Sequence, residues 1–346
     1  MVDFAGWSMP VQYSSIAEEH NAVRHDAGLF DIAHMGRLYF QGPGAGLFLD
    51  ALVTSDVAGL ELGQIRYGLI TNQEGGILDD VLTYRFPDGF LLVVNASNRM
   101  KILDWIHTVQ AGHEFELRDD TQTSAMLALQ GPKSVEILDA LTLPELDLHG
   151  LEYYTGLETE LLGVTAIISR TGYTGEDGFE VIIAAEKGGE LWEALMEKGK
   201  PYGLKPAGLG CRDTLRLEAG MPLYGHELSE EIDPFSAGLA FAVKLDKEHL
   251  IGREALKDLK ESFTKKRIGL ELEGRRIARE GTKIFHEGEE VGEVTSGTFS
   301  PTLEKPIAMG YVNKELAKAG TTFEVEIRGQ RFPAYAVKLP FYRREH

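Results

Sequence analysis

The sequence predicts an α+β region over residues 1–243, a connecting segment over 244–262 and a small all-β domain over 263–346. Strand and helix patterns alternate through the first region, without the order of a dinucleotide-binding fold. From Arg267 onward the pattern changes to closely spaced strands, a spacing typical of a sandwich or barrel. The charged connection is expected to be partly helical. Turns in the last region are expected at Gly274, Gly288, Gly297, Gly310, Gly320 and Gly329.

A helix-like pattern over Ser15–Phe30 ends near Gly28 and predicts one amphipathic helix. A strand at Arg37–Gln41 and a short helix at Leu47–Val53 are expected next. Further strands are predicted at Gly76–Phe86, Phe90–Val94, Ala125–Leu129, Val164–Ser169 and Phe179–Ala184. Further helices are predicted at Arg99–Val109, Pro132–Leu141 and Gly189–Lys198.

The glycine loop at residues 42–46 imitates a nucleotide-binding turn between a strand and a helix. Leu47 stands where the fingerprint requires a third glycine, and Pro43 lacks an amide that could contact phosphate. These departures favour a plain turn.

Composition limits the classes of function. The chain of 346 residues is 43% hydrophobic and 26% charged, as in folded multidomain enzymes. Its net charge of -19 argues against binding to nucleic acid or anionic membranes. An anionic ligand would need local arginines. No secretory or membrane-spanning pattern is present and Cys211 is the single cysteine, so a cytoplasmic protein is expected.

The first informative segment is Gly75–Arg85, in which two glycines lead into a strand with paired carboxylates. Strand alternation separates Asp79 from Asp80 and places Asp80 on the face of Leu82, Tyr84 and Phe86. A carboxylate on an apolar face is costly unless it has a partner or a function, so Asp80 marks a candidate site. The alternative is that Asp80 caps a turn.

The second segment is the glycine-rich turn Arg170–Gly178, which leads into a strand that is apolar on both faces. Glu180 opens that strand and could accept parallel hydrogen bonds from the N3–H and 2-amino group of a pterin. A buried salt bridge with an arginine is the alternative. Glu176 and Asp177, in the turn, are expected to face water.

The third segment is Leu209–Gly220, whose leucines and closing glycine suggest a helix. Arg212 and Arg216 lie one turn apart and could together hold a carboxylate, from a ligand or from Glu180. A structural network of ion pairs is the alternative.

Other catalytic patterns are missing from the sequence. The ten histidines, including His34, do not recur at metal-ligand spacing, and no metal is expected. Neither a Gly-x-Ser-x-Gly elbow nor a Walker loop occurs.

Together these three segments resemble the T-protein family, the aminomethyltransferases of the glycine cleavage system. The resemblance runs nearly from end to end and in order. Further matching motifs are Asp3-Phe-Ala-Gly-Trp-Ser-Met-Pro-Val-Gln-Tyr13, Phe30-Asp-Ile-Ala-His-Met-Gly36, Leu127-Ala-Leu-Gln-Gly-Pro132, Thr295-Ser-Gly297 and Ala308-Met-Gly-Tyr-Val312.

The resemblance implies a folate-binding region of two interleaved α+β (ferredoxin-like) subdomains, followed by a C-terminal β-barrel. It implies that Asp80 is the catalytic residue beside N5 and N10 of tetrahydrofolate, that Glu180 grips the pterin and that Arg212 belongs to the folate site. Other residues expected around the ligand are Met35, Asn95, Tyr173, Arg267, Tyr67 and Tyr224.

The resemblance also implies the reaction. The aminomethyl group on the lipoyl arm of H-protein would lose ammonia and pass its carbon to N5 of tetrahydrofolate, a co-substrate, to form 5,10-methylenetetrahydrofolate. Asp80 is expected to act electrostatically, because the reference pKa of aspartate, about 3.9, makes it a weak base unless burial raises that pKa.

Two alternatives share the fold. Folate-binding iron–sulfur assembly factors carry a Lys-Gly-Cys-x-x-Gly-Gln-Glu type motif, whereas Arg170–Glu176 has no cysteine, which favours the transferase. A stand-alone folate-dependent demethylase stays open. Family members usually carry a short helical segment ahead of the run that includes Trp7. If that segment orders the folate cleft or docks H-protein, its absence would impair affinity or partner recognition and leave the fold intact.

Overall fold

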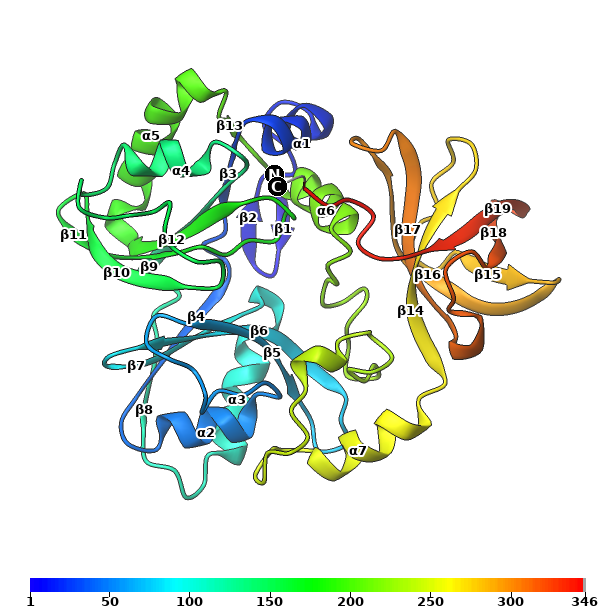
Figure 1. The fold of residues 1–346 in the computed structure, drawn as a ribbon, viewed down its shortest axis with the longest axis horizontal. Helices are drawn as coiled ribbons and strands as arrows, with labels where there is room; N and C mark the ends of the chain where they lie inside the picture. The colour runs from blue at the N-terminus through cyan, green and yellow to red at the C-terminus, as the bar shows by residue number, and fades with distance from the viewer. Residues whose placement is uncertain (345–346) are drawn as a thin grey trace.

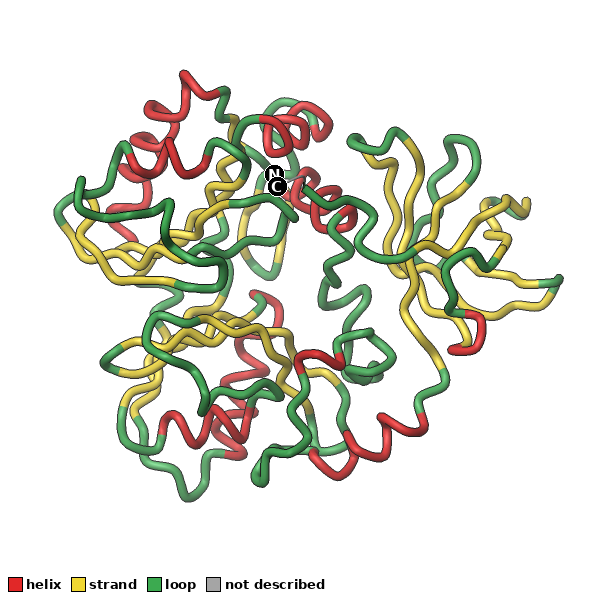
Figure 2. Tube along the Cα trace, in the orientation of Figure 1, coloured by secondary structure: helices red, strands yellow, loops and turns green. Residues whose placement is uncertain are grey.

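The computed structural model describes residues 1–344, which form two layered α+β units beside a β-barrel (Figure 1). Figure 2 shows that long loops, rather than regular elements, join the units near the centre of the molecule. Within residues 1–344, no helix is long and apolar enough to cross a membrane.

The first unit is built on a six-stranded sheet with the strand order β10-β11-β12-β9-β3-β13. Its neighbours are antiparallel except for β13, which pairs parallel with β3. The strands are β3 (Gly28–Asp31), β9 (Ser124–Gln130), β10 (Gly156–Leu161), β11 (Val164–Ser169), β12 (Gly178–Ala184) and β13 (Lys205–Pro206).

The second unit is a five-stranded sheet with the order β5-β6-β7-β4-β8. All of its strands lie between β3 and β9 in sequence, so this unit is inserted into the first, and the predicted interleaving is confirmed. The strands are β4 (Gly36–Gln41), β5 (Ile65–Thr71), β6 (Ile77–Phe86), β7 (Gly89–Val94) and β8 (Glu116–Asp119).

Helices cover the outer face of each sheet. Helices α4 and α5 pack on the six-stranded sheet, and α2 and α3 pack on the five-stranded sheet. The helices are α1 (Ile16–His25), α2 (Ala45–Leu52), α3 (Arg99–Val109), α4 (Ser134–Asp139), α5 (Gly188–Gly199), α6 (Leu209–Glu218) and α7 (Arg253–Ser262). Short 3₁₀ turns lie at η1 (Ala96–Asn98), η2 (Ala185–Lys187), η3 (Lys200–Tyr202), η4 (Ala240–Ala242) and η5 (Lys314–Leu316).

The inner faces of the two sheets pack against each other. Tyr84 and Phe86 of β6 share one buried cluster with Ile182 of β12, whereas Val181 of β12 belongs to the cluster under α4 and α5. Because successive side chains of a strand point to opposite faces, a strand with helices on one side and a sheet on the other is apolar throughout. This explains the apolar run of β12.

The barrel is closed in the order β14-β17-β16-β15-β18-β19. Closure leaves no sheet edge free for pairing with another chain. Its strands are β14 (Lys265–Leu272), β15 (Lys283–His286), β16 (Glu289–Ser300), β17 (Lys305–Asn313), β18 (Thr322–Ile327) and β19 (Gln330–Val337). The division of the chain after residues 243 and 262 stays a prediction.

Two of the expected turns are wrong. Gly297 lies inside β16 and Gly310 inside β17. A Cβ atom at Gly297 would lie 1.8 Å from the carbonyl oxygen of Ala278, so this glycine permits a close backbone approach and marks no turn.

Several strands were not predicted. The missed strands are β3, β5, β8, β10, β13 and the two strands of the N-terminal hairpin, β1 (Val2–Phe4) and β2 (Trp7–Met9). In β10, Glu158 and Glu160 are exposed and leave few apolar positions. In β5, Gly68 interrupts the apolar pattern. A glycine is needed there because a Cβ atom would lie 2.4 Å from the Val53 side chain. Such polar or interrupted strands give little alternation signal.

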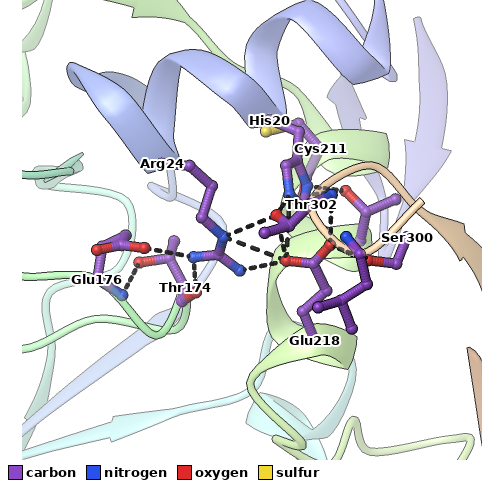
Figure 3. Close-up of polar contacts among 10 residues, drawn as sticks. His20, Arg24, Thr174, Glu176, Cys211, Glu218, Ser300 and Thr302 are labelled. Carbon is purple, nitrogen blue, oxygen red and sulfur yellow. Dashed lines mark hydrogen bonds and ion pairs between the residues drawn. The ribbon is translucent and has the colours of Figure 1, made fainter. Parts of the chain in front are cut away.

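A buried polar cluster joins the first unit to the barrel (Figure 3). Arg24 of α1 donates to Glu218 of α6 at 2.8 Å and to Glu176 at 2.9 Å. The barrel segment supplies the Thr302 hydroxyl, which donates to Glu218 at 2.8 Å. Glu176 is buried in this cluster, so the expectation that it faces water is wrong: the turn folds back onto α1, where Arg24 supplies a counter-charge.

The cluster stabilises the charged form of Glu218. Burial alone would raise the pKa of this carboxyl, but hydrogen bonds from His20 and Ser300 and the charge of Arg24 outweigh burial and lower the pKa to about 2. A depressed carboxyl pKa stabilises the fold above the unfolded-state value, near 4.5, and that stability is lost as the pH falls toward 2.

We therefore expect Glu218→Gln to lower the free energy of unfolding by on the order of 3 kcal/mol at pH 7. The reason is that Arg24 would stay buried without its main counter-charge. Urea titration at several pH values would measure this loss, which should shrink between pH 4.5 and 2. Glu280→Gln, which removes an exposed partner of His226, is the control and should change stability by less than about 0.5 kcal/mol. Equal losses in both variants would contradict a special role for the cluster.

Candidate active site

A cavity of about 310 Å³ opens where the two sheets diverge, and the loop after α6 and the first barrel strand complete its walls. Apolar side chains such as Leu82, Val93 and Met126 line its middle. Every residue that the family resemblance implied for the site lines this one cavity: Asp80, Glu180, Arg212, Asn95, Met35, Tyr173, Arg267, Tyr67 and Tyr224. The structure thus brings them together from both sheets, α6, the connecting loops and the barrel.

Asp80 projects from β6 into the cavity. The Asn95 side-chain amide donates to its Oδ1 at 2.8 Å, and the Tyr67 hydroxyl lies 3.2 Å from its Oδ2. Burial raises the pKa of Asp80, although these hydrogen bonds and the charge of Arg267 partly offset the effect. Asp80 therefore binds a proton more readily than an aspartate in water.

Asp79 is also buried, which strand alternation alone did not predict. It points to the opposite face of β6, but that face is covered by the start of α3 and Asp79 is fully buried. Asn95 and Asn98 hold its carboxylate. The sequence placed a buried carboxylate on one face of this strand, whereas the structure buries one on each face.

Glu180 faces the cavity from the opposite sheet. It lies on β12, and the Thr171 hydroxyl donates to its Oε2 at 2.5 Å. Burial raises the pKa of Glu180, while the Thr171 hydrogen bond and the charge of Arg212 act against that increase. No arginine forms an ion pair with Glu180 within residues 1–344, which leaves its second oxygen free to accept a donor from a ligand.

Arg212 and Arg216 have separate roles, so the expectation that they share one carboxylate is wrong. Arg216 pairs with Glu227 at 2.7 Å and with Asp213, away from the cavity. Arg212 lies over the Tyr173 ring with its guanidinium carbon 4.6 Å from the ring centre, and it has no ion pair in the part of the chain that the structure describes. Of the two, Arg212 lines the cavity between the sheets.

Arg267 and Tyr224 are fixed to the backbone. Arg267 donates to the carbonyl oxygens of Ala237 and Gly220, each at 2.9 Å. Tyr224 donates to the carbonyl oxygen of Ile77 at 3.1 Å, at the start of β6. These contacts place two side chains from distant segments beside Asp80 without consuming its hydrogen-bonding capacity.

Sequence reasoning missed two aromatic walls. Tyr154 lines the cavity from a bend where its φ is +63°, and Phe241 stacks on Tyr67 with ring centres 6.0 Å apart. Phe241 is 76% exposed, so it lies at the mouth of the cavity. The adjacent pair Tyr153-Tyr154 was a sequence signal that could have indicated Tyr154, whereas no sequence signal indicated Phe241.

A concave, mostly apolar cavity with a few convergent charged groups is typical of a small-molecule site. Here two carboxylates with raised pKa values and two arginines meet between aromatic side chains. The fold and the site are thus those of an enzyme with a small-molecule cavity that contains a buried carboxylate.

Comparison with known proteins agrees with this class. Residues 1–247 match the family model of the GCVT N-terminal domain, and residues 265–343 match the glycine cleavage T-protein C-terminal barrel domain. The aminomethyltransferase of Streptomyces avermitilis is 49% identical over all of this chain and 94% of its own length. That of Rubrobacter xylanophilus is 50% identical over all of this chain and 91% of its own length.

A solved structure has the same fold as this chain. The glycine cleavage system aminomethyltransferase T from Bartonella henselae is 35% identical, with a TM-score of 0.91 over 99% of this chain and 93% of that chain. The chain belongs to the glycine cleavage T-protein family, and it is a folate-dependent aminomethyltransferase.

Loss of the Glu180 charge should weaken folate binding. Glu180→Gln replaces one acceptor oxygen by a donor, so we expect the Kd for tetrahydrofolate to rise roughly 10- to 100-fold. Isothermal titration calorimetry under anaerobic conditions would measure it. Glu160→Gln, an exposed change on the edge strand β10 of the same sheet, is the matched control. An unchanged Kd in Glu180→Gln would exclude Glu180 from the folate contact.

Proposed function

We propose that this chain transfers the one-carbon unit of the aminomethyl group on lipoylated H-protein to tetrahydrofolate. Ammonia would leave and 5,10-methylenetetrahydrofolate would form. The observation that carries the proposal is the Asp80 carboxylate, which faces the same cavity as Glu180 and is oriented by Asn95 and Tyr67.

The side chains present fit tetrahydrofolate. Glu180 has a free oxygen for the N–H edge of a pterin, and Leu82, Val93 and Met126 supply apolar surface for the rings. Arg212 is available for an anionic or polar part of the ligand. When bound, tetrahydrofolate supplies the nucleophilic nitrogens N5 and N10.

Asp80 would stabilise the positive charge that develops where the carbon is transferred. A fixed carboxylate in a partly desolvated cavity performs this without reorganising water. The sequence favoured a purely electrostatic role, on the ordinary pKa of aspartate. Because burial raises the pKa of Asp80, the same carboxylate is also suited to take up a proton near neutral pH.

Arg267 and Tyr67 would tune this carboxylate. The charge of Arg267 favours the ionised form of Asp80, while the Tyr67 hydroxyl fixes one of its oxygens. The pKa of Tyr67 is itself raised, first by burial and then by the charge of Asp80, so Tyr67 stays a hydrogen-bond donor. Phe241, stacked on Tyr67 at the mouth of the cavity, would contact a lipoyl arm that enters there.

Asp80→Asn tests the proposal directly. We expect folate-stimulated release of ammonia from aminomethylated H-protein to fall about 100- to 1,000-fold, because the amide cannot balance the developing charge. Ammonia would be measured with and without tetrahydrofolate, and calorimetry should show that the variant still binds folate.

Wild-type protein that binds folate but releases no ammonia from aminomethylated H-protein would contradict the proposed partner. Folate-stimulated release that persists in Asp80→Asn would contradict the proposed role of Asp80. The two results are therefore separable.

A further inference from the structure

Asp79 is a fully buried carboxylate behind the candidate active site. It does not line the cavity, and it forms no ion pair with a cation within residues 1–344. Its oxygens accept from the Asn95 backbone at 3.0 Å, the Asn95 side chain at 2.8 Å and the Asn98 side chain at 2.6 Å. All of these partners are N–H groups, which stabilise a carboxylate and disfavour its protonated form.

Asn95 connects Asp79 to the cavity. Its single side-chain nitrogen lies 2.8 Å from Oδ1 of Asp79 and 2.8 Å from Oδ1 of Asp80. An amide has two N–H donors, so one can point to each carboxylate. Two negative groups are thus held on opposite faces of one strand with a single amide between them.

We propose that Asp79 is a positioning residue for the transfer reaction. It anchors Asn95, and through Asn95 it fixes the orientation of Asp80, while the two carboxyls oppose each other's ionisation through their charges. This inference rests on the proposed function for its catalytic meaning, but the coupling itself is a property of the free protein.

The sign of the effect follows from the charges nearby. A negative charge close to a carboxyl disfavours ionisation of that carboxyl, so the charge of one member of the pair raises the pKa of the member that ionises second. Burial and then the charge of Asp80 raise the pKa of Asp79, which is therefore the carboxyl that ionises second. The two carboxyls therefore titrate as a pair.

Other ionisable groups around the pair do not replace this coupling. Arg267 from the barrel faces Asp80 and favours its ionised form. Tyrosines face the pair from the neighbouring strand and loops, and burial raises the pKa of each, so they stay neutral: Tyr67, Tyr154, Tyr173 and Tyr224. Lys101 of α3 donates to the Tyr224 hydroxyl at 2.7 Å and to Glu230, and is therefore already paired.

The experiment is a titration of the free enzyme, followed by NMR of ¹³Cγ-labelled aspartate. The signals of Asp79 and Asp80 would be assigned by their loss in Asp79→Asn and Asp80→Asn. In Asp80→Asn we expect the midpoint of Asp79 to fall by about 1 pH unit, because Asp79 then ionises without a charge beside it. In Asp79→Asn we expect kcat for ammonia release to fall about 10-fold while the KM for folate stays nearly unchanged, because Asn95 no longer holds Asp80 in one orientation.

The titration does not require Asp79→Asn to fold, because it follows Asp79 in the wild type and in Asp80→Asn. Asp88→Asn removes the same charge from the exposed turn of the β6–β7 hairpin and should move neither midpoint.

The outcomes separate a positioning role from a merely structural one. If Asp80→Asn leaves the Asp79 midpoint unchanged, or if Asp79→Asn lowers the melting temperature but leaves kcat unchanged, the proposal is wrong. Because these midpoints are measured without folate or H-protein, a failure of the proposed reaction would not affect them.

Discussion

The cavity depends on the buried contact between Arg24 and Glu218. The cavity has walls from the two sheets and from the barrel, so its shape requires that the barrel keep one position against α1 and α6. The Arg24–Glu218 contact, with the Thr302 hydroxyl, lies at that junction. Two charges removed from water are costly, and this pair is satisfied by further hydrogen bonds on both sides. These directional contacts fix the position of the barrel against α1 and α6 more closely than apolar packing alone would.

The packing of the sheets explains where chemistry is possible. Where Tyr84 and Phe86 fill the space between the sheets, no ligand can enter. Two residues earlier in β6 the same face carries Leu82 and then Asp80, and there the sheets diverge and polar groups replace apolar ones. The site is therefore an interruption of the inter-sheet core, and its carboxylates share the low polarity of that core, which raises their pKa values.

Local patterns predicted much of the fold. The span of α3 and the strands at β6, β7, β11 and β12 follow from periodicity, because each has one clear apolar face or a fully apolar core position. The insertion of one sheet into the other came from the family resemblance. The order of strands within each sheet was not predicted, since periodicity carries no information on which strands pair. The closed barrel was likewise one of two options that the strand spacing allowed.

The candidate site shows the same limits. Asp80 and Glu180 were singled out from strand alternation, because a charged residue on an apolar face is locally visible. The separate partners of Arg212 and Arg216 could not be predicted, because they lie on loops that no local pattern places beside α6. Asp79 was underestimated for a related reason: only the packing of α3 shows that the second face of β6 is buried.

Arg267 is synthesised later than the other charged residues of the site. Asp80 and Glu180 leave the ribosome well before the first barrel strand, on which Arg267 lies. Until that strand is made, Ala237 and Gly220 have no guanidinium to bind, and the loop they belong to lacks its anchor beside Asp80. A nascent chain can thus complete both sheets while its cavity still lacks the wall that Arg267 supplies.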